Sequence, residues 1–165
     1  MNSKGNDAGN IRLALEERSF YRLSMLASRI NRCLSGAYIA KFGRPANGWK
    51  IVTILGRFGP MTMTELTEHT TLEIDKITRT VDALAEQGLA ERRTDSSDRR
   101  RVMASLTTKG KKAATELEKM IAVMEREFLV TVSSRDRDVF YRVLDELQAR
   151  ANQLFSGTRP WKRFV

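Results

Sequence analysis

At 165 residues, the chain is long enough for one sizeable domain, or for one domain with long helices appended, and it can bury a real core. Its 41% hydrophobic and 30% charged residues are ordinary for a folded protein, but the net charge of +9 and the pI near 10.1 favour a polyanionic partner, either nucleic acid or an acidic membrane surface. No apolar run approaches the roughly 20 residues that cross a bilayer. The single Cys33 excludes an intramolecular disulfide and fits a reducing cytoplasm, and one His with one Cys excludes a zinc finger.

The N-terminal part predicts a disordered lead-in over residues 1–11, without the apolar core of a signal peptide, and then a long helix. The helix is expected over residues 12–42, because apolar residues recur in steps of three and four; they are Phe20, Leu23, Ala27, Ile30, Leu34 and Ala37. Gly43 and Pro45 break the pattern, so residues 12–45 form the first predicted segment. A second helix follows over residues 49–58, with Asn47 as a candidate cap, and ends at Gly59.

A helix-turn-helix is predicted next. Thr62 followed by Glu65 has the spacing of a capping box and opens a short helix that ends near His69. After the polar turn 70–73, a helix over residues 74–87 carries one apolar face, made of Ile77, Val81 and Leu84, and stops at Gly88.

Residues 88–107 predict a basic β-hairpin directly after that helix. The strand-like runs 89–93 and 102–106 flank a polar tip, and between positions 92 and 112 eight cations and two carboxylates give a net charge of +6. A helix that fits the major groove of DNA and a thin arginine-tipped ribbon that reaches the backbone or minor groove are the parts of a winged helix-turn-helix. Residues 46–106 therefore form the predicted DNA-binding domain.

Two more helices are predicted at the C-terminal end. Thr107 or Thr108 caps one that runs to about Val130, and Ser133 or Ser134 caps another that runs to about Phe155. Both carry apolar stripes, made of Ala114, Leu117, Ile121, Met124 and Phe128, and of Phe140, Leu144, Leu147, Ala151 and Leu154. Such long stripes exceed what the central unit needs, so residues 107–156 and 12–45 are expected to form a two-fold dimer, with residues 157–165 as a basic tail.

The runs VDALAEQGLAERR and DRRRVMASLTTKG resemble the multiple antibiotic resistance regulator (MarR) family of winged-helix repressors. The resemblance implies a mainly α fold with a small β-wing, in which the winged helix-turn-helix is inserted between N- and C-terminal dimerisation helices. It implies that Arg100 enters the minor groove and that Asp98 orients it through an ion pair. It also implies a homodimer and a crevice for small aromatic acids or related effectors.

The expected DNA contacts come from the short helix, the second helix and the wing; they are Thr62, Asp75, Lys76, Thr78, Arg79, Asp98, Arg99, Arg100 and Arg101. For Arg79 the alternative is an internal ion pair with Asp82 or Glu86. Glu73 or Asp75 is expected to cap the helix through its carboxylate.

The resemblance implies that the effector crevice is lined by the segments that contain Arg29, Tyr38 and Trp49, and an aromatic wall plus a guanidinium suits an aromatic carboxylate. Cys33 lies close to the apolar stripe of the first helix and is predicted to be buried and structural rather than a redox sensor.

The sequence thus predicts a cytoplasmic, homodimeric repressor that binds a palindromic operator in double-stranded DNA and is released by a small ligand. No catalytic constellation, cofactor motif or metal site appears, so an enzyme is not expected. Two alternatives remain, an architectural protein that binds DNA without sequence preference and a helical adaptor for peptides or membranes.

Overall fold

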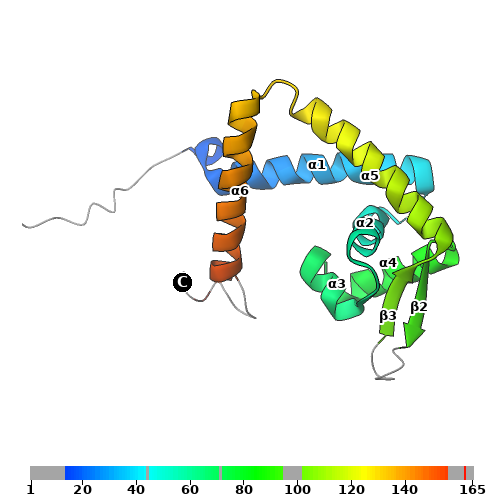
Figure 1. Cartoon of the computed structure of the whole chain (residues 1–165). Coiled ribbons are helices and arrows are strands. Elements are labelled where there is room, and N and C mark those ends of the chain that lie inside the picture. The colour runs from blue at the N-terminus through cyan, green and yellow to red at the C-terminus, as the bar shows by residue number, and fades with distance from the viewer. Residues whose placement is uncertain (1–13, 44, 71, 95–101, 156–161, 163–165) are drawn as a thin grey trace, which may run out of the picture. The chain divides into compact units, whose positions relative to one another are not determined.

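Helices make up most of the computed structural model, which describes residues 14–43, 45–70, 72–94, 102–155 and 162. In chain order they are η1 (Leu15–Glu17), α1 (Ser19–Phe42), α2 (Gly48–Phe58), α3 (Met63–Thr70), α4 (Ile74–Glu86), α5 (Thr108–Phe128) and α6 (Ser134–Phe155) (Figure 1). Three short strands complete the fold: β1 (Met61–Thr62), β2 (Ala90–Thr94) and β3 (Val102–Leu106). The predicted fold class, mainly helical with a small sheet, is confirmed.

The chain divides into two compact units, Met1–Glu118 and Lys119–Val165, with the boundary inside α5. The first unit contains the helices α1 to α4, the sheet and the N-terminal half of α5. The second contains the rest of α5 and the whole of α6. None of the described helices is both long and apolar enough to cross a membrane.

The core of the first unit lies where α2, α3 and α4 meet the sheet. Ile51 of α2 and Leu66 of α3 are fully buried there, and α4 adds the apolar face that the sequence predicted. Because α3 and α4 pack against each other across a short turn, they form the predicted helix-turn-helix.

The capping box that opens α3 is present. The backbone N–H of Thr62 donates to Glu65 Oε2 at 2.7 Å, and the N–H of Glu65 donates to Thr62 Oγ1 at 3.2 Å. Thr107 likewise caps α5 by accepting from the Gly110 N–H at 3.0 Å, and Ser133 caps α6 by accepting from the Asp136 N–H at 3.1 Å. These exchanges satisfy N–H groups that would otherwise lack a partner in the first turn.

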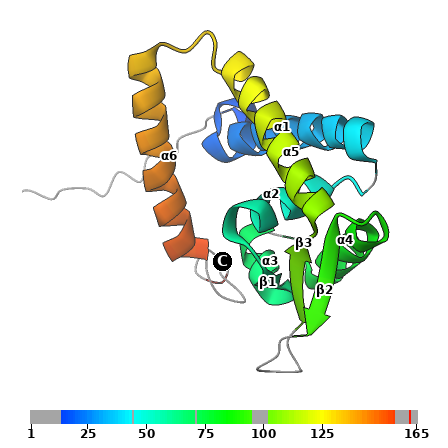
Figure 2. The same ribbon diagram turned by 45° about the vertical axis from the view of Figure 1, so that its right-hand side comes forward.

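The sheet has the order β1-β3-β2, and both pairings are antiparallel (Figure 2). In the hairpin, Ala90 pairs with Leu106 and Thr94 pairs with Val102. The strand β1, in which Met61 pairs with Ala104, was not predicted. A two-residue strand has no alternating pattern, so only its pairing with β3 reveals it.

The start of the first helix differs from the prediction. The helix α1 begins at Ser19, because Arg18 has an extended backbone (φ −71°, ψ 126°) that separates it from the turn η1; residues 12 and 13 lie outside the described part. In the predicted stripe, Leu34 is buried, but Phe20 is 77% exposed and Ile30 is 39% exposed. The N-terminal half of this stripe is therefore largely accessible within the part of the chain that the structure describes.

Cys33 is exposed, so the prediction of a buried cysteine was wrong for the single chain. It lies next to the buried Leu34 in sequence, but one step along a helix turns a side chain by about 100°. Proximity to the apolar stripe therefore did not bring its thiol into the core.

In the second unit, the apolar stripe of α6 faces solvent. No residue of α6 is buried, and Phe140, Leu144 and Leu147 are between 41% and 49% exposed. The Tyr141 hydroxyl donates to Glu125 Oε1 at 3.0 Å, and this hydrogen bond joins α6 to α5. The apolar stripe of α6 therefore stays partly exposed.

Candidate nucleic-acid interface

The helix α4 is oriented by its buried face. Ile77, Val81 and Leu84 have no exposed surface, and they recur in steps of four and three along one side. The opposite side therefore faces solvent, where Asp75, Lys76 and Arg79 are exposed and Thr78 is half-buried. The four predicted contacts of this helix are thus brought together on one accessible face.

Arg79 is held by its own helix rather than by a carboxylate. Its Nε donates to the Asp75 carbonyl oxygen at 3.2 Å, and no ion pair of Arg79 occurs among the described residues. Asp82, the predicted alternative partner, pairs with Arg92 instead. The terminal nitrogens of Arg79 are therefore not committed to Asp82 or Glu86, and they can donate to phosphate or a base edge.

The N-terminus of α4 is open. Glu73 is the N-cap residue, but its side chain makes no capping hydrogen bond, and Asp75 lies in the first turn. The prediction that one of these carboxylates caps the helix was wrong for Glu73, whose side chain is exposed. Free N–H groups at a helix start favour a bound anion.

Thr62 sits at the junction of β1 and α3 and is only 8% exposed. Its hydroxyl donates to Glu65 Oε2 at 2.8 Å and accepts from the Glu65 N–H. The side chain is thus already used inside the protein, in contrast to the exposed side chains of α4.

The wing is built on the stem of β2 and β3. The pairing ends at Thr94 and Val102. The predicted tip residues Asp98, Arg99, Arg100 and Arg101 lie outside the described residues.

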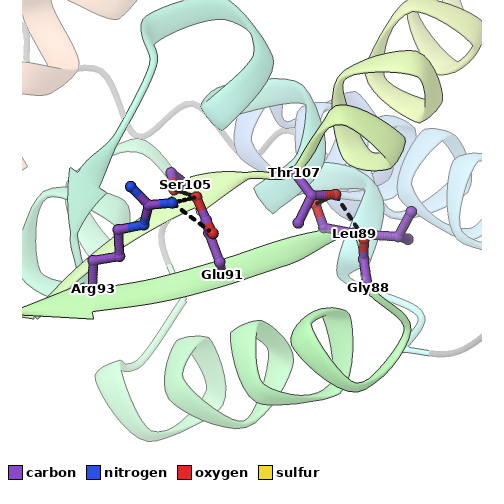
Figure 3. A network of polar contacts seen from close by, with 6 residues as sticks. All are labelled: Gly88, Leu89, Glu91, Arg93, Ser105 and Thr107. Atoms are coloured by element: carbon purple, nitrogen blue, oxygen red, sulfur yellow. Dashed lines mark hydrogen bonds and ion pairs between the residues drawn. The ribbon is translucent and has the colours of Figure 1, made fainter.

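The two arginines of the stem have different partners. Arg92 Nη1 lies 2.6 Å from Asp82 Oδ1 on α4, whereas Arg93 Nη2 lies 3.0 Å from Glu91 Oε1 on its own strand. Glu91 also accepts from the Ser105 hydroxyl at 3.1 Å, so the Arg93 network remains within the hairpin (Figure 3). Both arginines are among the eight cations counted in the predicted wing segment, and the structure pairs each of them with a carboxylate.

A tight corner joins the end of α4 to the start of α5. Gly88 has φ +69° and ends α4 in a conformation that other residues rarely adopt. The Thr107 hydroxyl donates to the Gly88 carbonyl at 2.6 Å (Figure 3). Lys109 Nζ donates to the Gln87 carbonyl at 2.8 Å. A Cβ at Gly110 would lie 1.8 Å from the Leu89 carbonyl oxygen. Sequence reasoning identified Thr107 as a cap but missed its second role in this corner.

Of the predicted effector residues, Tyr38 is buried, Trp49 is half-buried and Arg29 is exposed. The Tyr38 hydroxyl and Trp49 Nε1 are buried, and neither has a hydrogen-bond partner among the described residues. Burial raises the pKa of Tyr38 to about 12. Gly48 packs against the Tyr38 ring so closely that a Cβ there would lie 2.7 Å from it.

Arg29 does not share a side of α1 with Tyr38. Nine residues separate them, which corresponds to about 13 Å along the axis and to opposite sides of the helix. Within one chain the guanidinium is therefore remote from the two unpartnered polar groups.

The comparisons with known proteins agree with this geometry. Residues 46–102 match the model of the MarR family. The uncharacterized HTH-type transcriptional regulator YwoH of Bacillus subtilis (strain 168) is 29% identical over 60% of this chain and 72% of its own length. The HTH-type transcriptional repressor YetL of the same organism is 28% identical over 87% of this chain and 83% of its own length.

Solved structures show the same fold. A MarR/EmrR family transcriptional regulator from Acinetobacter sp. ADP1 superposes with a TM-score of 0.76 at 22% identity, covering 86% of this chain and all of the other. A MarR family regulator from Silicibacter pomeroyi DSS has a TM-score of 0.71 at 27% identity, covering 82% and 90%. The PcaV regulator of Streptomyces coelicolor, solved in complex with its natural ligand, has a TM-score of 0.69 at 19% identity, covering 84% and 97%.

The helix-turn-helix and its hairpin thus define a winged helix-turn-helix protein of the DNA-binding, transcription-regulating class. Residues 46–102 match the MarR family model, and the relatives that align with most of the chain are transcriptional regulators. The predicted resemblance is confirmed, and the relatives are regulators rather than members of a catalytic family.

Proposed function

We propose that this protein is a homodimeric, cytoplasmic repressor that binds a palindromic operator in duplex DNA and is released by a small ligand. The main observation that supports this proposal is the accessible face of α4. Lys76, Thr78 and Arg79 lie on it, opposite a fully buried apolar face and beside the stem of a basic hairpin. Lysine and arginine suit phosphate or the guanine edge in the major groove, and threonine suits phosphate or a thymine methyl. The wing residues Arg99, Arg100 and Arg101 are proposed to contact the minor groove or backbone, with Asp98 orienting Arg100.

The dimer is proposed because the apolar stripes at both ends of the chain are partly exposed among the described residues. Leu23 and Ile30 on α1, and Phe140, Leu144 and Leu147 on α6, are all more than one third exposed. A second copy is the simplest cover for apolar stripes of this length, since a monomer with such surfaces is prone to associate. Residues 12–45 and 107–156 are therefore proposed as the dimerisation segments, flanking the DNA-binding segment 46–106.

The ligand proposal rests on the two unpartnered groups near the start of α2. A buried hydroxyl and a buried indole N–H that find no partner among the described residues are unfavourable unless something accepts a hydrogen bond from them. An aromatic carboxylate offers both a flat ring and oxygen acceptors. Arg29 can join this site only from the second subunit of a dimer, because within one chain it projects from the other side of α1.

The experiment that tests the function is selection of duplexes from a random library by the full chain, followed by competition at moderate salt. A repressor enriches a palindromic sequence, and the enriched duplex persists against an excess of random duplex. If the two duplexes compete equally, the protein binds DNA as an architectural factor instead. Flotation with anionic liposomes, without any DNA selection, would point to a membrane adaptor.

A further inference from the structure

One ion pair links the wing to the helix that reads DNA. Arg92 Nη1 lies 2.6 Å from Asp82 Oδ1, and the contact has hydrogen-bond geometry. Asp82 belongs to the last part of α4 and Arg92 to the middle of β2, ten residues later, while the turn at Gly88 lies between them. The two elements also pack directly against each other. The pair therefore bridges the two parts that would have to enter adjacent grooves.

The position of Asp82 on α4 makes an unpaired carboxylate unfavourable there. Asp82 follows Thr78 by four residues and Arg79 by three, so it shares their side of the helix. A lone negative charge on a face that approaches phosphates would be repelled by them. The guanidinium of Arg92 neutralises that charge.

The neighbouring Arg93 provides the contrast. Successive side chains of a strand point to opposite faces, so Arg93 projects away from the Arg92 side. Its side chain is 74% exposed and pairs with Glu91 of the same strand, whereas the Arg92 side chain is 36% exposed and pairs across to another element. Two adjacent arginines of one strand thus have different surroundings.

From this we propose that Asp82 and Arg92 form a positioning pair, which holds the stem of the wing at a fixed place against the recognition helix, and that Arg92 does not contact phosphate. The inference rests on the proposed DNA-binding function, because the pair is proposed to set the distance between the recognition helix and the wing. The wing then approaches DNA already oriented, and less ordering of the hairpin is needed when the complex forms.

The pair itself is tested on the full chain without DNA, by hydrogen exchange of the amides of β2 and β3. The variants are Asp82→Ala, Arg92→Met and the double substitution, with Arg93→Met as the matched control. Each single substitution is expected to speed exchange about two- to fivefold, and the double to add nothing further, as for a pair that acts as a unit. Arg93→Met should leave the rates unchanged. Unchanged rates in Asp82→Ala and Arg92→Met, or an equal rise in Arg93→Met, would overturn the proposal.

The consequence for binding is tested by titrating the same variants against the duplex that the wild-type chain selects. Asp82→Ala and Arg92→Met should each weaken binding about two- to fivefold per subunit with an unchanged salt dependence. If Arg92 touched phosphate, its loss would lower the slope of log affinity against log salt by about one per subunit. That result, or stronger binding by Asp82→Ala, contradicts the pair's role in positioning.

Failure of the proposed function gives a different result. If the wild-type chain selects no duplex, the DNA-binding proposal fails, while the exchange rates of the free protein still decide whether Asp82 and Arg92 hold the wing on α4.

Discussion

Much of the proposed function depends on single side chains, and a substitution of Arg100 is the most direct test of it. Arg100→Ala should weaken operator binding by about 1–3 kcal/mol per subunit, because a groove-inserted arginine makes contacts that alanine cannot replace. The measurement is a mobility-shift titration, with gel filtration to show that the assembly is unchanged. Wild-type affinity in the variant would remove Arg100 from the interface.

Gly110 tests the corner between α4 and α5. Gly110→Ala should lower the free energy of unfolding by about 3 kcal/mol, since its Cβ would collide with the Leu89 carbonyl oxygen, a backbone atom that cannot turn aside. Urea denaturation measures the loss. Gly36→Ala in α1 is the control, because no atom lies within 4 Å of its added Cβ and alanine is the better helix former by about 1 kcal/mol. Equal stability of the two variants would mean that the corner yields easily.

Tyr38 gives a prediction about pH. Its hydroxyl is neutral in the folded state up to a pKa of about 12 but ionises near pH 10 when unfolded, so the unfolded state loses its proton first. The wild-type protein should therefore lose stability between pH 10 and 12, and Tyr38→Phe should lose less over the same interval. At pH 8 the variant should be about 1 kcal/mol more stable, because it lacks an unpartnered buried hydroxyl. Chemical denaturation of both proteins at pH 8 and between pH 10 and 12 checks this. Parallel pH profiles of the two proteins would show that the hydroxyl is solvated.

At the scale of elements, α6 is predicted to be part of the dimer interface. Truncation after Val130 should abolish dimerisation or folding, because it removes the exposed apolar stripe of α6. Leu144→Arg in the full chain separates the two effects, since it should give a folded monomer. Light scattering measures the mass and circular dichroism the helix content. A folded dimer from the truncated chain would place the interface elsewhere.

Most elements were predictable because each is defined by local chemistry. The capping box at Thr62 and Glu65, the apolar face of α4 and the glycine at position 88 were confirmed close to their expected bounds. The features that were not predicted depend on contacts between residues that are distant in the chain. The strand β1 exists only through β3, and the pairing of Arg92 with Asp82 requires the hairpin to fold back onto α4.

The candidate site was predictable in its residue types more than in its geometry. The exposed face of α4 followed from helical periodicity, and Lys76, Thr78 and Arg79 lie on it as expected. The grouping of Arg29 with Tyr38 does not agree with the geometry of one chain. It was based on which segments the two residues belong to, and positions nine residues apart on one helix point in opposite directions. The exposure of Cys33 has the same origin.

At the scale of the whole molecule, an effector should act as a switch between two states. An aromatic carboxylate is expected to lower operator affinity, and substituted benzoates serve as the probes. The expected decrease is about 5–150-fold, which is the usual range of coupling between two sites. Arg29→Ala should abolish this response and leave binding without ligand nearly intact, since Arg29 lies on α1 and away from the exposed face of α4. Titrations with and without the acid measure both quantities. A variant that responds like the wild type would exclude Arg29 from the effector site.

The stem of the wing also bears on how such proteins diverge. The pairing of Thr94 with Val102 holds the two ends of the tip about 5 Å apart, whatever residues come between them. Substitutions or changes of length within residues 95–101 therefore leave the register of the strands and the packing of α4 as they are. Variation can accumulate in the tip at little cost to folding, so relatives can acquire new DNA targets there while the helices and the stem remain the same.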